Sequence, residues 1–308
     1  MFIGEYMNGK KCLVTGGCGF VGSTLVDKLV NLGHEVAVID NLSSRSHEKF
    51  YYNETGKVKY AKQSVTDYAS CLPVFEIFKP DVVFHLAAMT SIRQSIEEAG
   101  TCMLVNVVGT ENMLALSRKF EVNRFVFVSS SAVYGSSPKK SQKETDELCP
   151  TNPYAYSKWF GENICKMNSE LYGIDTVCFR PFNIYGPRQP AKGDYAPVIG
   201  KFEQQKSGGS PLTVFGDGEQ RRDFIHVDDV CDALILGAFD QESQRGEVYN
   251  LGSNKNYSVN QIAQMIGGKI EYLPENKGEV RSTLANISKA KANFGWIPKK
   301  CLETDYIK

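Results

Sequence analysis

Short apolar runs alternate with amphipathic stretches through the first half of the chain. The apolar runs cover residues 11–15, 35–40, 58–61, 81–85 and 124–128. Apolar side chains recur at helical spacing in residues 20–31, 69–78 and 102–119. Runs of Val, Leu and Phe without polar alternation are typical of strands that are buried on both faces. The alternation of strand and helix therefore predicts an α/β fold with a doubly wound parallel sheet.

The pattern changes after about Arg180. Residues 183–222 hold many Gly and Pro, and helical spacing returns only in residues 195–205, 227–239, 258–266 and 287–294. We therefore predict a first domain over residues 1–180 and a smaller, less regular domain over residues 181–308, with an interleaved boundary. Open α/β sheets bind ligands at the carboxyl ends of their strands. We expect the second domain to cap that edge of the sheet and to bind the substrate.

Composition and charge exclude several classes of function. The 308 residues include 35 Lys plus Arg and 35 Asp plus Glu, without a run of five like charges, which disfavours a nucleic-acid partner. No stretch of 18 apolar residues occurs, and the first eleven residues lack the apolar core of a secretory signal. The nine Cys form no CxxC pair and the four His have no ligand spacing, so we expect reduced thiols, a cytoplasmic location and no metal site.

A glycine-rich segment, Thr15–Gly22 (TGGCGFVG), follows the first predicted strand and opens the first predicted helix. Glycines at 16, 19 and 22 permit a tight turn and a close approach of the backbone to a pyrophosphate. The helix that begins near Phe20 offers free N–H groups and the positive end of its dipole. The segment predicts a dinucleotide site, although a glycine turn between a strand and a helix is common.

The second predicted strand ends at an acidic residue, Asp40, which lies 18 residues after Gly22. An acid about 20 residues beyond such a loop accepts hydrogen bonds from the adenosine ribose. Because a carboxylate would repel a 2′-phosphate, we expect NAD rather than NADP. Arg45 leaves the other choice open, since a nearby Arg could pair with that phosphate.

Tyr154 and Lys158 are four residues apart in a predicted helix whose first turn contains Pro153. A phenol has a pKa of about 10, so ionising it at pH 7 costs about 4 kcal/mol. A neighbouring ammonium favours the phenolate and offsets part of that cost. The pair suits removal of a proton from an alcohol that is being oxidised.

The glycine loop, Asp40 and the YxxxK pair occur together in an order that resembles the extended short-chain dehydrogenase/reductase superfamily. Four more segments match that pattern over nearly the whole chain, namely His85–Ala88 (HLAA), Ser129–Gly135 (SSSAVYG), Arg180–Pro187 (RPFNIYGP) and Arg221–Asp229 (RRDFIHVDD). Within the superfamily the chain is similar to nucleotide-sugar epimerases and dehydratases, especially UDP-sugar 4-epimerases. The resemblance implies a Rossmann-type NAD domain and a smaller C-terminal nucleotide-sugar domain.

The resemblance also implies the residues that hold NAD. Those expected to contact it are Gly16, Gly19, Phe20, Val21, Gly22, Asp40, Asn41, Asp67, Leu86, Ala87, Ala88, Asn106, Ser129, Tyr154, Lys158 and Pro181. Asp67 matches an acid near the adenine, and Asn106 matches the family's conventional helix Asn. Tyr154 is the implied acid/base, and Lys158 lowers its pKa while holding the nicotinamide ribose.

A serine near the sugar 4-hydroxyl is implied to assist proton movement. Counting back from Tyr134 indicates Ser130, which we prefer, and counting along the triple serine indicates Ser131. The nucleotide sugar is expected to contact Ser130, Ser131, Tyr154, Asn183, Val198, Thr213, Phe215, Arg222, Arg281 and Thr283. The two arginines suit a diphosphate because charge-assisted hydrogen bonds favour Arg.

The implied reactions share oxidation at C4 of the sugar and differ in the later steps. Similar dehydratases and decarboxylases carry acids between the Ser/Thr and the VYG element, whereas this chain has Ser130-Ser131-Ala132. A site without that acid can oxidise C4, let the 4-keto sugar rotate, and return hydride to the other face. This pattern favours 4-epimerisation with NAD regenerated in place.

The small residue Thr283 stands where some similar epimerases carry a bulky Tyr, so the sugar pocket has room for a 2-acetamido group. Similar glucuronate epimerases can also have a small residue there. The preferred substrates are therefore UDP-N-acetylglucosamine and UDP-N-acetylgalactosamine, then UDP-glucose and UDP-galactose. A UDP-glucuronate 4-epimerase, an NAD-dependent nucleotide-sugar dehydratase or reductase, and a non-catalytic NAD-sensing protein are the alternatives. The resemblance also implies a homodimer through helices near 102–119 and 154–171.

Overall fold

The computed structural model describes residues 9–43, 58–137, 139–190, 197–242, 244–275 and 280–306. Arg45 lies outside these residues. The chain forms two compact units. Unit 1 contains the described residues up to Ser130 together with Asn152–Phe179 and Cys231–Val248, and unit 2 contains the rest. The predicted division into residues 1–180 and 181–308 remains a prediction.

A seven-stranded sheet runs in the order β10-β6-β5-β4-β1-β2-β3. Its strands are β1 (Lys11–Thr15), β2 (Glu35–Ile39), β3 (Val58–Ala61), β4 (Val82–His85), β5 (Arg124–Val128), β6 (Thr176–Pro181) and β10 (Glu247–Leu251). The strand pairs from β3 across to β6 are parallel. The order 3-2-1-4-5-6 is that of a Rossmann sheet, so the predicted fold class is confirmed. Its order reverses between β1 and β4, where such sheets bind their ligands.

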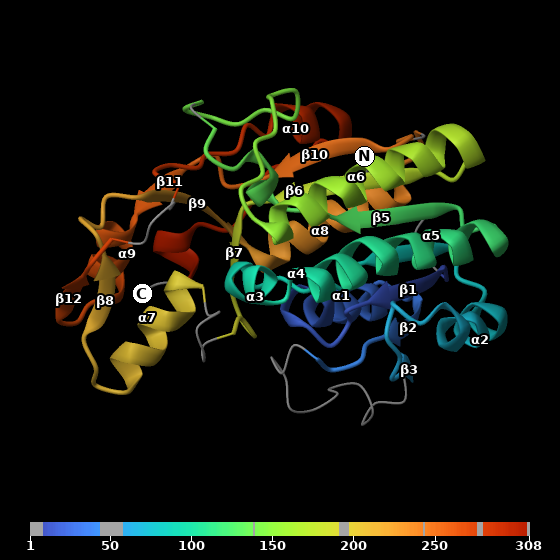
Figure 1. Ribbon diagram of the computed structural model, residues 1–308, viewed down its shortest axis with the longest axis horizontal. Helices are drawn as coiled ribbons and strands as arrows, with labels where there is room; N and C mark the ends of the chain where they lie inside the picture. Colours follow the sequence, from blue (N-terminus) through green and yellow to red (C-terminus); the bar gives the residue numbers. More distant parts are fainter. Residues whose placement is uncertain are drawn as a thin grey trace. The chain divides into compact units, whose positions relative to one another are not determined.

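Helices cover both faces of this sheet (Figure 1). They are α1 (Phe20–Asn31), α2 (Tyr68–Phe78), α3 (Ile92–Glu97), α4 (Ala99–Met103), α5 (Gly109–Lys119), α6 (Pro153–Tyr172) and α8 (Val227–Phe239). On one face, buried side chains of α2, α5 and α6 pack against alternate strand residues such as Leu13 and Phe125. The intervening residues Cys12 and Val14 point to the other face and are also buried, because α1 contacts β1 and β2 there.

The region predicted as a single helix over residues 102–119 is not one continuous α-helix. Helices α4 and α5 are joined by a π-helical turn, Leu104–Val108, in place of a regular α-helical turn. Helix α6 begins as predicted, since the Asn152 side chain accepts a hydrogen bond from the Ala155 nitrogen at 3.0 Å and Pro153 follows. Turns of π-helix such as Leu104–Val108 are often found at functional sites.

Unit 2 contains a three-stranded sheet and a two-stranded sheet. Its strands are β7 (Asn183–Tyr185), β8 (Leu212–Phe215), β9 (Arg221–His226), β11 (Asn256–Ser258) and β12 (Ile270–Leu273). The strand orders are β11-β9-β7 and β12-β8. Its helices are α7 (Val198–Ser207), α9 (Val259–Ile266) and α10 (Ser288–Phe294), with a 3₁₀ turn at Ser131–Tyr134 and a π-helical turn at Leu302–Tyr306. A core that includes Phe202, Val214 and Ile262 joins α7, β8 and α9.

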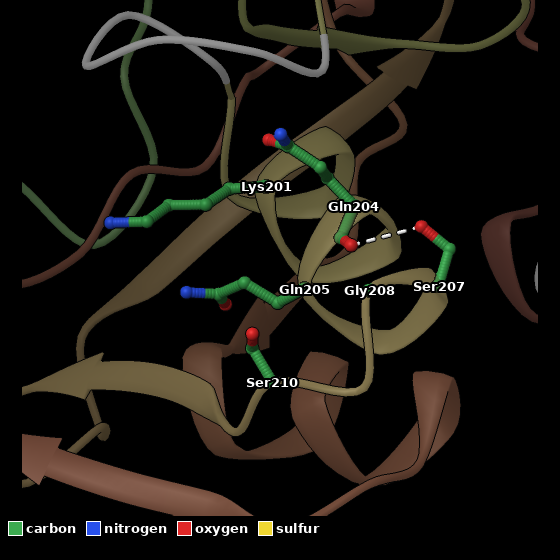
Figure 2. Close-up of a pocket in the computed structure, with 6 residues that line it drawn as sticks. All are labelled: Lys201, Gln204, Gln205, Ser207, Gly208 and Ser210. Atoms are coloured by element: carbon green, nitrogen blue, oxygen red, sulfur yellow. Dashed lines mark hydrogen bonds between the residues drawn. The ribbon is translucent and has the colours of Figure 1, made fainter.

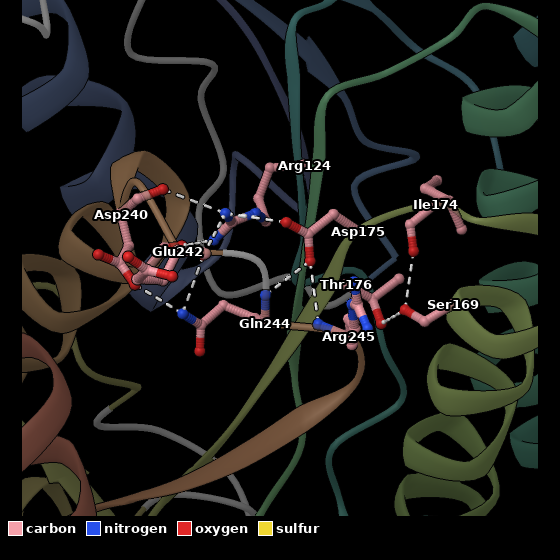
Figure 3. A network of polar contacts seen from close by, with 10 residues as sticks. Arg124, Ser169, Ile174, Asp175, Thr176, Asp240, Glu242, Gln244 and Arg245 are labelled. Carbon is pink, nitrogen blue, oxygen red and sulfur yellow. Dashed lines mark hydrogen bonds and ion pairs between the residues drawn. The ribbon is translucent and has the colours of Figure 1, made fainter.

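A polar network holds the amino ends of β5 and β6 (Figure 3). The buried Arg124 pairs with Asp175 at 2.9 Å and donates to the backbone carbonyl of Gly237 at 2.5 Å. It also donates to the carbonyls of Asp240 and Glu242 at 3.1 and 3.0 Å. One guanidinium therefore joins the start of β5 to the end of α8 and the residues that follow it. A positive charge is stabilising at a helix C-terminus.

Candidate active site

The glycine loop between β1 and α1 leaves no room for side chains. Gly16 has φ +71°, and an added Cβ would lie 2.7 Å from the Ala87 nitrogen. An added Cβ on Gly22 would collide with the carbonyl oxygen of Gly16. Gly16 therefore needs the left-handed conformation and Gly22 the close approach, and only glycine supplies both without strain.

The first turn of α1 faces the loop without a side-chain cap. Gly19 is the N-cap residue, and no side chain accepts hydrogen bonds from the first-turn N–H groups there. Phe20, Val21 and Gly22 form this turn. Unsatisfied N–H groups and a positive dipole end suit a phosphate group.

Asp40 lies beside the same loop. Its Oδ2 accepts a hydrogen bond from the Cys18 nitrogen at 2.9 Å, and its Oδ1 accepts one from the Leu42 nitrogen at 2.7 Å. The neighbouring Asn41 is exposed and accepts from the Ser43 nitrogen at 3.0 Å. The acid is therefore oriented by the backbone, and the remaining lone pairs of its two oxygens could accept from ribose hydroxyls.

The segment after β4 passes next to the end of β1. The Leu86 nitrogen donates to the Thr15 carbonyl at 3.1 Å, and the Ala87 nitrogen donates to the Thr15 hydroxyl at 3.2 Å. Leu86, Ala87 and Ala88 are half-buried. This places the predicted Leu86–Ala88 segment against the glycine loop, as the motif implies.

His85 has a structural role that the sequence did not reveal. Its Nδ1 lies 2.7 Å from the Thr15 hydroxyl, and its Nε2 lies 3.0 Å from the Thr110 hydroxyl. Burial lowers the pKa of His85 to about 3, so the imidazole is neutral. It therefore ties β1, β4 and α5 together beneath the loop.

Two further predicted cofactor residues organise the backbone around them. Asp67 caps α2 by accepting from the Ser70 nitrogen at 3.1 Å. Asn106, buried in the π-helical turn, accepts from the Met89 nitrogen at 2.8 Å and donates to its carbonyl at 3.0 Å. Its amide also donates to the Ser157 hydroxyl at 2.8 Å. Asn106 thus links the segment after β4 to α6, and contacts of either residue with NAD remain predictions.

Ser130, Tyr154 and Lys158 all belong to unit 1, with Tyr154 and Lys158 one turn apart in α6. Tyr154 is 9% exposed and Lys158 is 4% exposed. Burial raises the pKa of Tyr154, and a side-chain hydrogen bond with Ser130 opposes that effect. Ser130 is therefore the serine that the structure joins to the tyrosine, whereas Ser131 begins the 3₁₀ turn in unit 2.

The Lys158 ammonium lies under strand β5. It donates to the Val128 carbonyl at 2.8 Å and stands 5.1 Å from the centre of the Phe127 ring. Burial lowers the pKa of Lys158 to about 8. Within the described residues it forms no ion pair. A buried ammonium with three N–H donors and one carbonyl acceptor suits further oxygen partners, such as ribose hydroxyls.

Three polar side chains around α6 were not predicted from the sequence. The Ser95 hydroxyl accepts from the Tyr154 nitrogen at 3.2 Å. Glu162, one turn after Lys158, accepts from the Ser129 hydroxyl at 2.5 Å. The Ser157 hydroxyl accepts the hydrogen bond from the Asn106 amide. The four-residue spacing between Lys158 and Glu162 could have indicated that Glu162 shares the helix face of Lys158. Nothing in the sequence predicts that Glu162 is buried.

These features fit a dinucleotide. The Cβ-free cradle, the uncapped turn of α1, the oriented Asp40 carboxylate and the buried Lys158 all belong to unit 1. The cradle and the uncapped turn would together hold a pyrophosphate, Asp40 a ribose hydroxyl pair, and Lys158 the nicotinamide ribose. Two other residues predicted to contact NAD are less accessible to a ligand. Ser129 is buried and its hydroxyl is bonded to Glu162, and Pro181 is buried at the end of β6.

Apart from Ser130 and Tyr154, the predicted nucleotide-sugar residues lie in unit 2. Asn183 begins β7 and donates to the Asp223 carbonyl at 2.8 Å. Arg222 lies in β9 and donates to the Arg221 carbonyl at 3.0 Å. Arg281 is exposed and binds both carboxylate oxygens of Asp217 at 2.8 Å. That guanidinium lowers the pKa of Asp217 to about 2.

A surface pocket of about 410 Å³ lies along α7 (Figure 2). Gln205 and Lys201 line it and also contact two predicted substrate residues. Gln205 donates to the Thr213 hydroxyl at 2.9 Å, and the Lys201 ammonium lies 5.2 Å from the Phe215 ring centre. Val198, the third predicted residue here, is the first residue of α7.

Thr283 carries a buried hydroxyl. Its Oγ1 has no hydrogen-bond partner among the described residues, while its nitrogen donates to the Arg221 carbonyl at 3.1 Å. A buried hydroxyl without a partner is unfavourable, so this atom suits a polar group of a ligand.

Metal-binding clusters and membrane-spanning helices are both absent from the described residues. No cluster of three or more His, Cys, Asp or Glu side chains there could hold a metal ion. None of the helices found there has the length and apolar character needed to cross a membrane.

The fold and the site define a Rossmann-type, dinucleotide-dependent class of protein. Residues 12–252 match the model of the NAD dependent epimerase/dehydratase family. The chain belongs to this family, and the predicted resemblance and the NAD cofactor are confirmed.

Similar proteins agree with this assignment. A UDP-glucose 4-epimerase from Mycolicibacterium smegmatis is 34% identical over 300 residues, which cover 95% of both chains. The NAD complex of the Thermus thermophilus UDP-glucose 4-epimerase superposes with a TM-score of 0.86 at 31% identity, covering 95% of both chains. A UDP-N-acetylglucosamine 4-epimerase from Methanobrevibacter ruminantium, in complex with UDP-N-acetylmuramic acid, gives a TM-score of 0.87 at 32% identity, covering 96% of this chain and 94% of that one.

Proposed function

We propose that this protein is an NAD-dependent 4-epimerase of a UDP-hexose. One observation supports this most directly. Tyr154 is buried with a hydrogen bond to Ser130, Lys158 is buried one turn further along α6, and Ser130–Ala132 contains no carboxylate. Such a site can move the proton of a sugar hydroxyl, but it has no acid next to Ser130 to drive elimination. It therefore supports epimerisation over dehydration.

Tyr154 is the proposed acid/base. Its phenolate accepts the proton of the sugar 4-hydroxyl, and the phenol returns a proton when the hydroxyl is restored. Burial opposes the phenolate, and the hydrogen bond from Ser130 favours it. Under this proposal the positive charge of Lys158, one turn further along α6, favours the phenolate as well. The full cost for an ordinary phenol at pH 7 is about 4 kcal/mol.

When bound, NAD supplies the hydride acceptor and donor that a reversible oxidation at C4 requires. The protein's part is to hold and orient. The glycine loop, the first turn of α1 and Asp40 would bind the adenosine half, and Lys158 would bind the nicotinamide ribose. Buried side chains around Tyr154 exclude water while C4 is oxidised.

The diphosphate of the substrate is assigned to Arg222 and Arg281. Arg281 is paired with Asp217, but both side chains are more than half exposed, and exposed pairs contribute little to stability. A diphosphate carries more charge than a carboxylate and accepts the same forked donors. Arg281 can therefore exchange one anion for the other.

The preferred sugar pair is UDP-N-acetylglucosamine and UDP-N-acetylgalactosamine. The support is the buried, unpartnered hydroxyl of the small residue Thr283, which could bond an acetamido group. UDP-glucose and UDP-galactose, which lack that group, are the second pair.

The direct test is incubation of the purified protein with UDP-N-acetylglucosamine or UDP-glucose and separation of the products. The expected result is the 4-epimer without net change of NAD. Release of a 4-keto sugar would replace the proposal with a dehydratase. Stable NAD binding without turnover of any UDP-hexose would favour an NAD-sensing protein.

Replacing Thr283 tests the choice of sugar. In Thr283→Tyr, the phenol would occupy the space of the acetamido group, while a hexose with a 2-hydroxyl still fits. We expect kcat/KM for UDP-N-acetylglucosamine to fall at least about tenfold relative to UDP-glucose, since one steric change in a pocket is worth about 1–3 kcal/mol. Thr283→Ser is the matched control and should preserve the ratio. An unchanged ratio in Thr283→Tyr would separate this residue from sugar selection.

We also propose a homodimer. Exposed apolar side chains follow one face of α6, namely Tyr156, Phe160, Met167 and Leu171, and others lie on the adjacent α3 and π-helical turn, namely Ile92, Ile96, Leu104 and Val108. Monomers rarely expose such contiguous apolar surface. Two copies related by a two-fold axis could bury it as a four-helix interface.

Light scattering of the purified protein checks the homodimer. The chain mass is 34.3 kDa, so the expected particle has about twice that mass. Phe160→Glu should shift it toward the monomer, whereas Ile77→Glu, an exposed apolar residue of α2, should not. A wild-type monomer at micromolar concentration would contradict the proposal.

A further inference from the structure

Glu162 is a buried carboxylate on the helix that carries Tyr154 and Lys158. It is 5% exposed and stands four residues after Lys158 in α6. Residues four apart lie on the same helix face. A buried carboxylate is costly unless it is hydrogen-bonded or acts on a nearby charge. Its position therefore calls for a partner or a function.

The partner lies in the segment that follows β5. The Ser129 hydroxyl donates to Oε1 of Glu162 at 2.5 Å, a short, charge-assisted distance. Ser129 is further held by its nitrogen, which donates to the Phe179 carbonyl at 2.7 Å. The residues on either side of Ser129 are both in the site, because Val128 accepts from Lys158 and Ser130 bonds Tyr154. Glu162 therefore anchors the two elements that carry the proposed catalytic groups to each other.

The second effect of Glu162 is electrostatic. The titratable groups that act on Lys158 are Cys102 from α4, Cys165 and Glu162 from α6, and His85 from β4. His85 is neutral, and thiols are mostly neutral at pH 7. Glu162 is the one carboxylate among these groups in the described residues. It opposes the burial that lowers the pKa of Lys158 to about 8.

We propose that Glu162 is a positioning residue that fixes the Ser129–Ser130 segment to α6 and keeps the Lys158 ammonium charged at the pH of catalysis. The inference rests on the proposed function for the work that it assigns to Tyr154 and Lys158. The energetic coupling between Glu162 and the charge of Lys158 can be measured without enzymatic turnover.

The first experiment compares pH profiles of kcat/KM for the NAD-loaded wild type and Glu162→Gln. Glutamine keeps an oxygen that accepts from Ser129 and removes the charge. Lys158 should then lose its proton at lower pH, and the alkaline limb should move to lower pH. Glu170→Gln is the matched control, because it removes a charge from an exposed position of the same helix. Its profile should coincide with wild type.

Ser129→Ala separates positioning from charge. It removes the hydrogen bond to Glu162 and leaves the carboxylate in place. We expect a lower kcat with little change in KM, and an alkaline limb at the same pH as in wild type, since the charge that acts on Lys158 remains. A kcat equal to wild type would overturn the anchoring role.

The second experiment is a double-mutant cycle on unfolding midpoints in denaturant at pH 7, using Glu162→Gln, Lys158→Met and both changes. If Glu162 supports the ammonium, Glu162→Gln lowers the midpoint more in the wild type than in the Lys158→Met background. Equal losses in the two backgrounds would show a purely structural role and overturn the inference. Coupling in a protein without epimerase activity would uphold the inference and reject the proposed function. If Glu162→Gln does not fold alone but folds with Lys158→Met, that rescue is itself the coupling.

Discussion

Strand β5 has a buried cation at each end, and the two are treated in opposite ways. Arg124 begins the strand and is 6% exposed, whereas Lys158 donates to the carbonyl of the last strand residue, Val128, and is 4% exposed. Arg124 has a carboxylate partner and three backbone carbonyl partners (Figure 3). Lys158 has one carbonyl and the face of Phe127. The same strand therefore carries an ion-paired cation at one end and, at the other, a cation with no ion pair among the described residues.

The difference follows from the place of each end in a parallel sheet. The amino ends of β5 and β6 meet connections that need only to be held, so Arg124 can direct its donors to fixed oxygens. The carboxyl ends are where ligands of such sheets bind. Under the proposed function, Lys158 keeps donors for a ligand and a charge for Tyr154, which fits the absence of an ion pair at Lys158 among the described residues. A buried charge without an ion pair is typical of functional sites, and a paired one of structural sites.

The largest effect that this comparison predicts is on catalysis at the carboxyl end. Tyr154→Phe removes the proposed acid/base without removing packing volume. Turnover of the UDP-hexose should fall about 10²–10⁴-fold while NAD stays bound, as loss of general acid–base catalysis predicts. Steady-state kinetics with absorbance of the bound cofactor measure both. Near-normal activity would remove Tyr154 from the mechanism.

The next effect concerns stability at the amino end. Arg124→Met removes the ion-pair partner of the half-buried Asp175, which keeps the Gln244 and Arg245 nitrogens as donors. It also removes the guanidinium that donates to three backbone carbonyls. The free energy of unfolding should fall by about 3–5 kcal/mol, the usual cost of breaking a buried ion pair. Denaturant titration measures this, and turnover per folded molecule should stay near wild type.

Arg124→Lys is the graded control for that change. It keeps the charge but loses the guanidinium fork, so it should have an intermediate loss of stability. If Arg124→Met were as stable as wild type, the contrast between the two ends of β5 would not hold.

The smallest effect is a gain that depends on pH. The pKa of Lys158 is about 8 in the folded protein, against an ordinary value of 10.5, so the unfolded chain binds more protons between these values. Below pH 8 the charged lysine destabilises the folded state, and this penalty disappears as pH rises toward 10.5. Lys158→Met should therefore be more stable than wild type by up to about 3 kcal/mol near pH 7, because one pKa unit corresponds to about 1.4 kcal/mol.

The difference in unfolding free energy between wild type and Lys158→Met should narrow steadily from pH 8 to pH 10.5. Unfolding curves at several pH values measure it, with Lys166→Met, an exposed lysine of the same helix, as the control. A Lys158→Met protein that is less stable than wild type at pH 7 would show that the ammonium is satisfied and that the two cations are alike.

Much of the unit 1 fold could be predicted from local pattern. The strand at Lys11–Thr15 and the helix at Phe20–Asn31 have the bounds that their apolar spacing predicts, because burial on both faces leaves a strong signal. The short helix Ile92–Glu97 was not predicted, since six residues carry little periodicity. The regular helix predicted over residues 102–119 missed the π-helical turn, in which the buried Asn106 bonds Met89 and Ser157 from other parts of the chain.

The site divides in the same way. By itself the sequence determined the glycine cradle, Asp40, Tyr154 and Lys158, because loop chemistry and helical spacing are local properties. Only the tertiary structure decided which serine bonds Tyr154, that His85 is a neutral tie, and that Arg281 pairs with Asp217. It also decided that a carboxylate at 162 is buried against Ser129 beside Lys158. Burial and hydrogen-bond partners are set by residues distant in the chain, so charge and pKa at this site depend on the folded arrangement.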